Sequence, residues 1–149
     1  MKDALSLLKN LNNIRNQVDN LSISLKKAIG YYTKMNGEML DSINIGNQLS
    51  TFTDLTKQLT AYINILQIKE RMGIERAVGT VAINKGYFKG GQLGKFSILV
   101  AEQHSFEREF LNNASKKTIS YYKEILNNNI VRRIEDIENI LLNDVIKKE

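Results

Sequence analysis

The chain has 149 residues, a formal net charge of +5 and no cysteine, proline or tryptophan. This length is typical of one domain, and the lack of thiols excludes disulfide scaffolds, cysteine-ligated zinc and cysteine nucleophiles. The only histidine, His104, excludes catalysis that needs two imidazoles as well as His-rich metal sites. We therefore expect no metal and no cofactor, and the diffuse positive charge does not indicate a nucleic-acid partner.

Apolar residues recur at helical spacing along the first half of the chain, and the absence of proline favours long helices. The first helix ends near Asp19, a second is expected over about 24–49, and a third continues to about Lys85. We expect Ser50 or Thr51 to be the N-cap of the third helix. The first helix carries an apolar stripe of Leu5, Leu8, Leu11, Ile14 and Val18. The stripe of the third helix consists of Phe52, Leu55, Leu59, Tyr62 and Leu66.

The glycine-rich segment 86–91 predicts a loop, after which helical spacing resumes. A fourth helix is expected over about 92–112, a shorter one over 115–127, and a break at 127–129. The fourth helix places Phe96, Leu99, Phe106 and Phe110 on one side. The last helix carries Ile130, Ile134, Ile137, Leu141 and Val145. No segment has a convincing strand pattern, so we predict one all-α domain over 1–149, an antiparallel bundle of about six long helices.

Polar residues interrupt these stripes at two places. Arg15 falls on or beside the stripe of the first helix, and the stripe of the third continues into Glu70 and Gly73, with Arg76 flanking it. Burying an unpaired guanidinium is very costly, so each arginine needs a carboxylate, a carbonyl, water or a bound anion. Either Glu70 or Glu75 pairs with the arginines and fixes the packing, or the arginines bind a small planar oxyanion.

Three other features need no ligand to explain them. Gly73 is costly inside a helix, which indicates close packing or a cavity. His104 is expected to be a surface or partly packed residue. Pairing at helical spacing explains the charges of the last helix without a site, namely Arg132, Arg133, Glu135, Asp136 and Glu138.

The stretch from Leu66 to Ala77 resembles the signature of the nitrate- and nitrite-sensing (NIT) domain, whose core is Lys-Glu-x-x-Gly-x-Glu-Arg-Ala. The first helix is similar to the family's Leu-x-x-Leu-x-x-(Ile/Leu)-Arg-x-x-(Val/Ile)-Asp pattern through Leu8, Leu11, Ile14, Arg15, Val18 and Asp19. Further similarities are Tyr31, Tyr32 and Asn36 in the second helix, and Phe96, Val100, Glu102 and Gln103 after the glycine loop. The resemblance covers nearly the whole chain.

The resemblance implies a helical sensor whose ligand is nitrate or nitrite and whose anion contacts are arginines. It supports Arg15 and Arg76 as ligand-binding residues, and it adds Arg71, which lies inside the motif at a position that varies. Glu70, Gly73 and Glu75 are then supporting residues, the two carboxylates by orienting the arginines. With the resemblance, an anion site between the first and third helices is favoured over a purely structural ion pair.

We therefore expect the extracytoplasmic sensory domain of a bacterial chemoreceptor (methyl-accepting chemotaxis protein), excised from a dimeric receptor of the inner membrane. The alternatives are a structural or protein-interaction bundle, or the input domain of a sensor kinase. An enzyme is not expected, because the sequence holds no nucleophile–base pair, metal cluster or cofactor loop.

Overall fold

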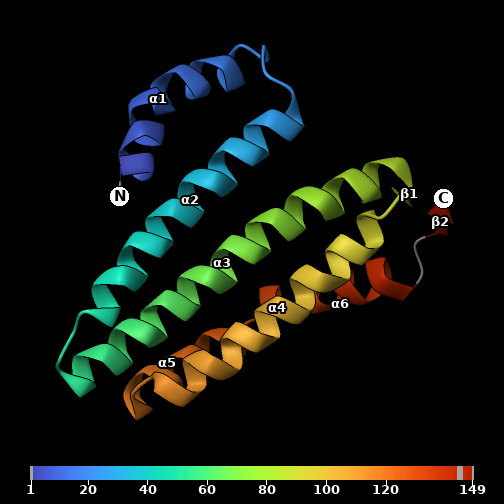
Figure 1. Cartoon of the computed structure of the whole chain (residues 1–149). Coiled ribbons are helices and arrows are strands. Elements are labelled where there is room, and N and C mark those ends of the chain that lie inside the picture. The colour runs from blue at the N-terminus through green and yellow to red at the C-terminus, as the bar shows by residue number, and fades with distance from the viewer. Residues whose placement is uncertain (1, 144–145, 149) are drawn as a thin grey trace. The chain divides into compact units, whose positions relative to one another are not determined.

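The computed structural model describes residues 2–143 and 146–148, and in this part of the chain it contains six helices (Figure 1), so the expected all-α class is confirmed. The helices are α1 (Lys2–Asp19), α2 (Leu25–Gln48), α3 (Thr53–Lys85), α4 (Gln92–Asn113), α5 (Lys116–Leu126) and α6 (Asn129–Asn143). Internal packing divides the chain into an N-terminal unit, residues 1–56, and a C-terminal unit, residues 57–149. The prediction of a single domain remains a prediction.

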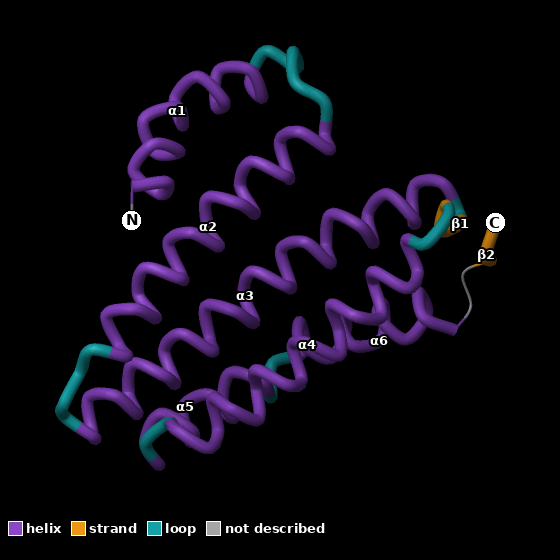
Figure 2. Tube along the Cα trace, viewed as in Figure 1, coloured by secondary structure: helices purple, strands orange, loops and turns teal. Residues whose placement is uncertain are grey.

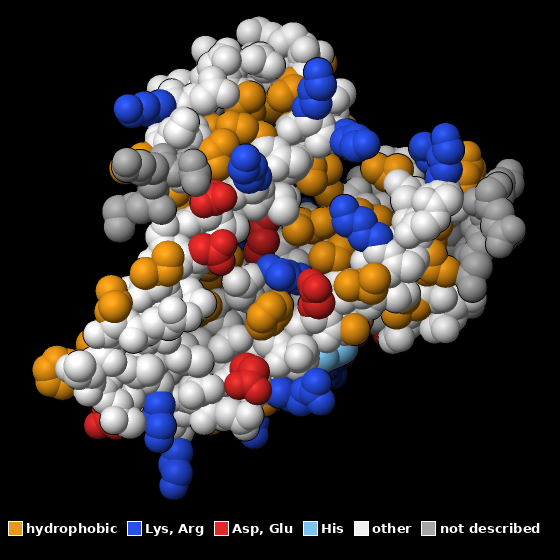
Figure 3. All heavy atoms as spheres, viewed as in Figure 1, with side chains coloured by type: hydrophobic (Ala, Val, Ile, Leu, Met, Phe, Trp, Pro, Cys, Tyr) orange, Lys and Arg blue, Asp and Glu red, His pale blue; other side chains and the backbone are white. Residues whose placement is uncertain are grey.

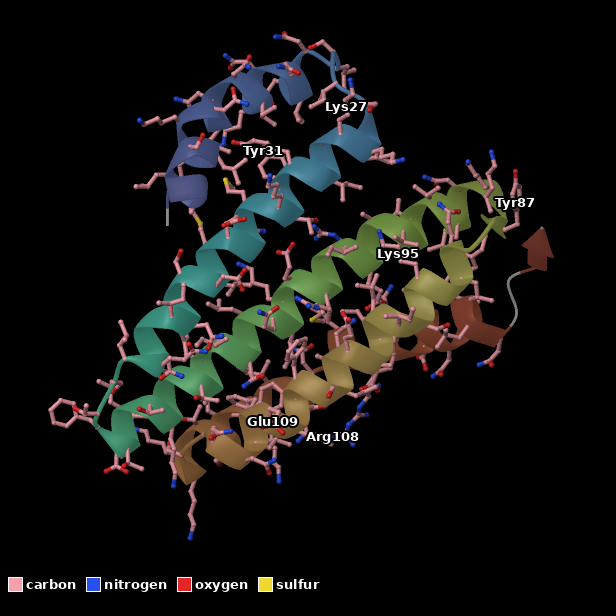
Figure 4. All side chains as sticks on the ribbon, viewed as in Figure 1. Lys27, Tyr31, Tyr87, Lys95, Arg108 and Glu109 are labelled. Carbon is pink, nitrogen blue, oxygen red and sulfur yellow. The ribbon has the colours of Figure 1, made fainter. Side chains whose placement is uncertain are left out.

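In the N-terminal unit, α1 packs against α2 through a face that differs from the predicted stripe. Its buried and half-buried positions among residues 4–19 are Ala4, Leu7, Leu11, Ile14 and Gln17. Leu5, Leu8 and Val18 are instead 54%, 39% and 36% exposed, so three of the five residues of the predicted stripe are wrong. The leucine-rich sequence offers two overlapping stripes, and α1 uses the one that contains Leu7, whose carbonyl accepts a hydrogen bond from the Tyr31 hydroxyl on α2 (Figure 4).

The turn after α1 requires a left-handed residue, and Leu21 supplies it with a φ of 55°. The N–H of Leu21 donates to the carbonyl of Val18 at 3.0 Å, and the N–H of Ser22 donates to that of Gln17 at 2.8 Å. These two bonds form a Schellman motif, in which glycine is the usual left-handed residue. Leu21 therefore holds a strained backbone, and its side chain, which is 91% exposed, gains little from packing.

The N-terminus of α3 differs from the prediction by one or two residues. The first helical hydrogen bond runs from the N–H of Thr56 to the carbonyl of Phe52 at 2.9 Å, which makes Phe52 the capping position. The Ser50 hydroxyl accepts from the Phe52 N–H at 3.4 Å and so shapes the preceding turn. The predicted cap at Ser50 or Thr51 is wrong, because the Ser50 hydroxyl bonds to the N–H of Phe52 itself and not to an N–H of the first helical turn.

In the C-terminal unit, α4 returns antiparallel to α3 after a turn in which Gly86 and Gly91 have φ values of 73° and 67°. This turn contains β1 (Tyr87–Lys89), which pairs in parallel with β2 (Ile146–Lys148). Neither strand was predicted, because a segment of three residues is too short to show an alternating pattern.

The remaining two helices of the C-terminal unit, α5 and α6, are separated by a break at residues 127–128, which lies within the predicted break at 127–129 (Figure 2). α5 packs on α4, where the Tyr122 hydroxyl donates to Glu107 Oε1 at 2.9 Å and the rings of Phe110 and Tyr122 lie 4.9 Å apart. α6 runs parallel to α3, since two contacts follow the same order along both helices. Glu138 is bonded to Glu75, and about one turn later Leu141 Cδ1 lies 3.1 Å from the position that a Cβ of Gly79 would occupy. The parallel course of α3 and α6 explains why β1 and β2, which follow them, are also parallel.

The core lies at the end of the C-terminal unit where the turn between α3 and α4, which contains β1, packs onto the helices. It consists of Ala82, Phe88, Phe96 and Leu141. The predicted face of α4 is confirmed, since Phe96, Leu99 and Phe110 are buried and Phe106 is half-buried. Gly79 permits this packing, because a Cβ there would lie 3.1 Å from Leu141 Cδ1 and 3.3 Å from Phe96 Cε2.

The predicted stripes of α3 and α6 are largely exposed. On α3, Phe52, Leu55 and Tyr62 are exposed, and the buried residues are Ala61, Asn64, Glu75, Gly79 and Ala82. On α6 only Leu141 of the predicted stripe is buried, Ile130, Ile134 and Ile137 are exposed, and Val145 lies outside the described residues. Apolar side chains at the surface are visible in orange in Figure 3. Small and polar residues on α3 thus form the interior, while larger apolar ones remain accessible.

Candidate functional site

A groove of about 510 Å³ lies between α3 and α6 in the C-terminal unit. Its apolar lining includes Met72, Ile83, Phe96, Ile134, Ile137 and Leu141. Its polar lining includes Lys69, Glu75, Arg76, Thr80 and Glu138. The central motif of the sequence therefore lies along this groove, and three of the predicted site residues, Gly73, Glu75 and Arg76, line it.

The polar centre of the groove is a pair of carboxyl groups, one from each helix. Glu75 on α3 is only 7% exposed, and its carboxylate accepts a hydrogen bond from Gln103 Nε2 on α4. Glu138 on α6 forms a side-chain hydrogen bond with Glu75. Two carboxyl groups bond to each other only when a proton lies between them.

Burial raises the pKa of Glu138 from 4.5 to about 7, with further contributions from the charge of Glu75, the hydrogen bond to Glu75 and the charge of Glu135. The pKa of Glu138 rises because both the low-dielectric surroundings and a nearby negative charge disfavour the ionised form of its carboxyl group. As the pH falls below about 7, Glu138 therefore takes up a proton that it can donate to Glu75.

Arg76 lines the groove from an exposed position next to Glu75. Arg76 thus flanks the α3 face that packs inward, which contains Glu75 and Gly79, but its own side chain is exposed. Among the side chains that the structure describes, Arg76 forms no ion pair. Its guanidinium can therefore accept an anion without giving up a carboxylate partner.

Arg71 lies on a different part of α3 and already has partners. Its Nε donates to Glu102 Oε2 at 3.0 Å, its Nη1 donates to Gln67 Oε1, and its guanidinium lies 4.8 Å from the centre of the Phe106 ring. This arrangement ties α3 to α4. An anion at Arg71 would have to compete with the Glu102 carboxylate.

Arg15 belongs to the N-terminal unit, on α1, and its side chain is exposed. Of the two expected placements, on or beside the buried face, the structure shows the second, since α1 buries the neighbouring Ile14. Within the described part of the chain Arg15 also forms no ion pair. Its role as an anion ligand remains a prediction.

The supporting residues behave differently from one another. Glu75 is buried and bonded, as described above, whereas Glu70 is half-buried on the same helix. Gly73 is exposed on the groove, and a Cβ there would meet no atom within 4 Å. Of the two explanations that the sequence offered for Gly73, the structure favours a cavity and contradicts close packing.

Two residues of the centre were not found by reasoning from sequence. Glu138 was interpreted as a solvated charge of α6, but it is half-buried and faces Glu75. Gln103 was noted only as part of the resemblance, and its bond to a buried carboxylate was not foreseen. His104 beside it is a surface residue, as predicted, with its side chain 71% exposed.

Two further properties concern the part of the chain that is described. No group of three or more His, Cys, Asp or Glu side chains there is arranged to hold a metal ion. Within residues 2–143 and 146–148, none of the helices combines the length and the hydrophobicity that a membrane crossing needs.

A comparison with protein families gives one match. The family described as "Nitrate and nitrite sensing" (NIT) matches residues 1–148. No curated protein and no solved structure matches the chain. The match thus extends over both units and includes the groove.

Proposed function

The chain belongs to the nitrate- and nitrite-sensing family, and from this premise we propose that it is the extracytoplasmic sensory domain of a bacterial chemoreceptor. In this proposal it binds nitrate or nitrite through arginine side chains and passes a conformational signal across the inner membrane. The receptor is anchored in that membrane and acts as a homodimer. The family is a sensing family, so a binding function rather than turnover is the starting point.

The observation that carries the proposal is that the Arg76 guanidinium is accessible at the groove. It lies in the stretch that resembles the family signature, is exposed at a groove, and has no ion pair among the described side chains. A planar guanidinium suits a planar oxyanion, because it offers parallel N–H donors. Arg15, also exposed and without an ion pair in the described region, is the second proposed ligand residue.

The signal starts from the proximity of Arg76 to the carboxyl pair. Arg76 follows Glu75 in the chain, and both line the groove with Glu138 of α6. An anion that neutralises Arg76 removes a positive charge near the pair and therefore favours its protonated, hydrogen-bonded form. That form links α3 to α6 more strongly, so anion binding biases the packing of the last helix.

Titration calorimetry with sodium nitrate, sodium nitrite, sodium formate and sodium chloride tests the proposal on the wild type and on Arg76→Ala, Arg15→Ala and Arg71→Ala. We expect nitrate or nitrite to bind the wild type. Arg76→Ala and Arg15→Ala should each lower this affinity at least tenfold, which corresponds to about 1.4 kcal/mol of binding free energy. Arg108→Ala is the matched control, because Arg108 is an exposed arginine of α4 outside the groove (Figure 4).

The thermal midpoint of each variant separates binding from folding, because a ligand raises the midpoint only where it binds the folded state. Since Arg76 and Arg15 are exposed, their variants are expected to fold. Nitrate affinity that is equal in Arg76→Ala, Arg15→Ala and Arg108→Ala would contradict the arginine site. Sedimentation equilibrium with and without nitrate tests the homodimer.

A further inference from the structure

The groove between α3 and α6 is much larger than a nitrate ion requires. Its volume of about 510 Å³ lies in the range of pockets that hold small organic molecules, about 300–1,000 Å³. We propose that this groove is a second ligand site, which binds a small organic ammonium ion with an apolar body, and that Glu75 and Glu138 are its counter-charge. This inference does not depend on nitrate sensing.

The apolar body is indicated by the walls of the groove. Met72 and Ile83 of α3 are 41% and 57% exposed, and Ile134 and Ile137 of α6 are 37% and 46% exposed. These four side chains line one groove together with the core residues Phe96 and Leu141. An alkyl or aromatic body along the walls would remove this apolar surface from water, at about 25 cal/mol for each Å² buried.

The ammonium group is indicated by the carboxyl pair. Glu75 is buried, Glu138 is half-buried, and both line the groove with carboxyl groups that accept hydrogen bonds when they are ionised. An ammonium group has three donors and no acceptor, so it replaces the shared proton and bonds to both carboxylates. The pair is thereby freed from the repulsion that keeps one of its members protonated.

The other charged groups near the site act more weakly. Lys69 and Arg76 also line the groove, but both side chains are exposed, so solvent and salt screen their repulsion of a cation. Glu135, on the same helix as Glu138, adds negative charge. Gln103 contributes an amide that is already bonded to Glu75, and it carries no charge. Charge at the buried centre therefore favours a cation.

The test is a set of calorimetric titrations of the wild-type protein with three ligands that share one apolar body: hexylammonium, hexanol and hexanoate. We expect hexylammonium to bind at least tenfold more tightly than hexanol, and hexanoate to bind more weakly than either. The affinity for hexylammonium should rise by up to about tenfold from pH 6 to pH 8, because protons then compete less for the pair. Methyl NMR shifts of Ile134 and Ile137 locate the ligand in the groove.

Two variants decide whether the carboxyl pair is responsible. Glu138→Gln should weaken hexylammonium binding at least tenfold and leave hexanol binding unchanged. Asp136→Asn is the matched control, since Asp136 is an exposed carboxylate on the same helix that does not line the groove. Equal affinities for hexylammonium and hexanol, no binding of either, or full hexylammonium affinity in Glu138→Gln would overturn the proposal.

A nitrate titration of the same samples keeps the two proposals apart. Glu138→Gln leaves Arg76 intact, so loss of amine binding with retained nitrate binding contradicts neither proposal. Hexylammonium that binds a wild-type protein without nitrate affinity would contradict nitrate sensing alone. Nitrate that binds without any hexylammonium affinity would contradict the second site alone.

Discussion

Glu138→Gln is the substitution that probes the carboxyl pair most directly, because glutamine keeps the size of the side chain and can donate a permanent hydrogen bond to Glu75. A pKa raised from 4.5 to about 7 corresponds to about 3 kcal/mol between the two protonation states. Since the Glu138 side chain remains partly exposed, solvent screening reduces this figure to about 1–2 kcal/mol. The variant should be more stable than the wild type by this amount at high pH.

The direction of the pH dependence follows from the raised pKa of Glu138. Between pH 4.5 and about 7, the folded protein keeps a proton that the unfolded chain releases. The stabilisation from this proton is therefore full below the lower value and is lost as the pH rises through about 7. Glu138→Gln lacks this titration, so its advantage should appear over this window and remain constant above it.

Urea unfolding followed by circular dichroism at intervals between pH 5 and pH 8.5 measures the effect. Asp136→Asn removes an exposed carboxylate from the same helix and should follow the pH profile of the wild type. If the wild type and Glu138→Gln lose or gain stability in parallel over the whole range, Glu138 does not share a proton with Glu75 in the folded protein. The reasoning about the pair would then be refuted.

Three further predictions concern stability and use the same unfolding assay. Leu21→Gly should stabilise the protein by about 0.5–1 kcal/mol, because it relieves a left-handed leucine; an unchanged midpoint would contradict strain there. Gly73→Ala should stabilise by about 1 kcal/mol, since its Cβ meets nothing, whereas Gly79→Val should destabilise, since even a Cβ lies 3.1 Å from a neighbouring side chain. Equal effects of the two would contradict the packing. A double-mutant cycle of Arg71→Ala with Glu102→Gln should give a coupling of about 0.5–1 kcal/mol, and zero coupling would mean that this ion pair does not hold α3 to α4.

Helix positions were predictable because the relevant signals are local. The absence of proline favoured long helices. The glycine cluster at 86–91 and the asparagine run at 127–129 mark helix ends through their local backbone preferences, and the predicted ends agree with the structure within about two residues. The face that each helix buries depends on its neighbours instead. In α1 the leucines provide two stripes, and in α6 the isoleucines line a groove, so periodicity alone predicted burial that does not occur.

The candidate site was predictable only on one helix. Glu75 and Arg76 were found because charged residues interrupt the apolar stripe of α3 and because their types and order resemble a family signature, and both line the groove. Glu138 lies more than sixty residues later, next to arginines that explained its charge equally well. Its contact with Glu75 depends on the parallel course of α3 and α6, which no local pattern reveals.

Glu75 and Arg76 illustrate how one short stretch can serve two ligands of opposite charge. A helix turns about 100° for each residue, so neighbours in the sequence point in clearly different directions. Glu75 is consequently buried against Gln103, while Arg76 remains exposed at the edge of the same groove. A small anion at Arg76 would occupy little of the 510 Å³, and an ammonium ion at the carboxyl pair would need the volume that the anion leaves. An anion and a cation bound in the same groove attract each other, so occupancy of one proposed site would favour occupancy of the other.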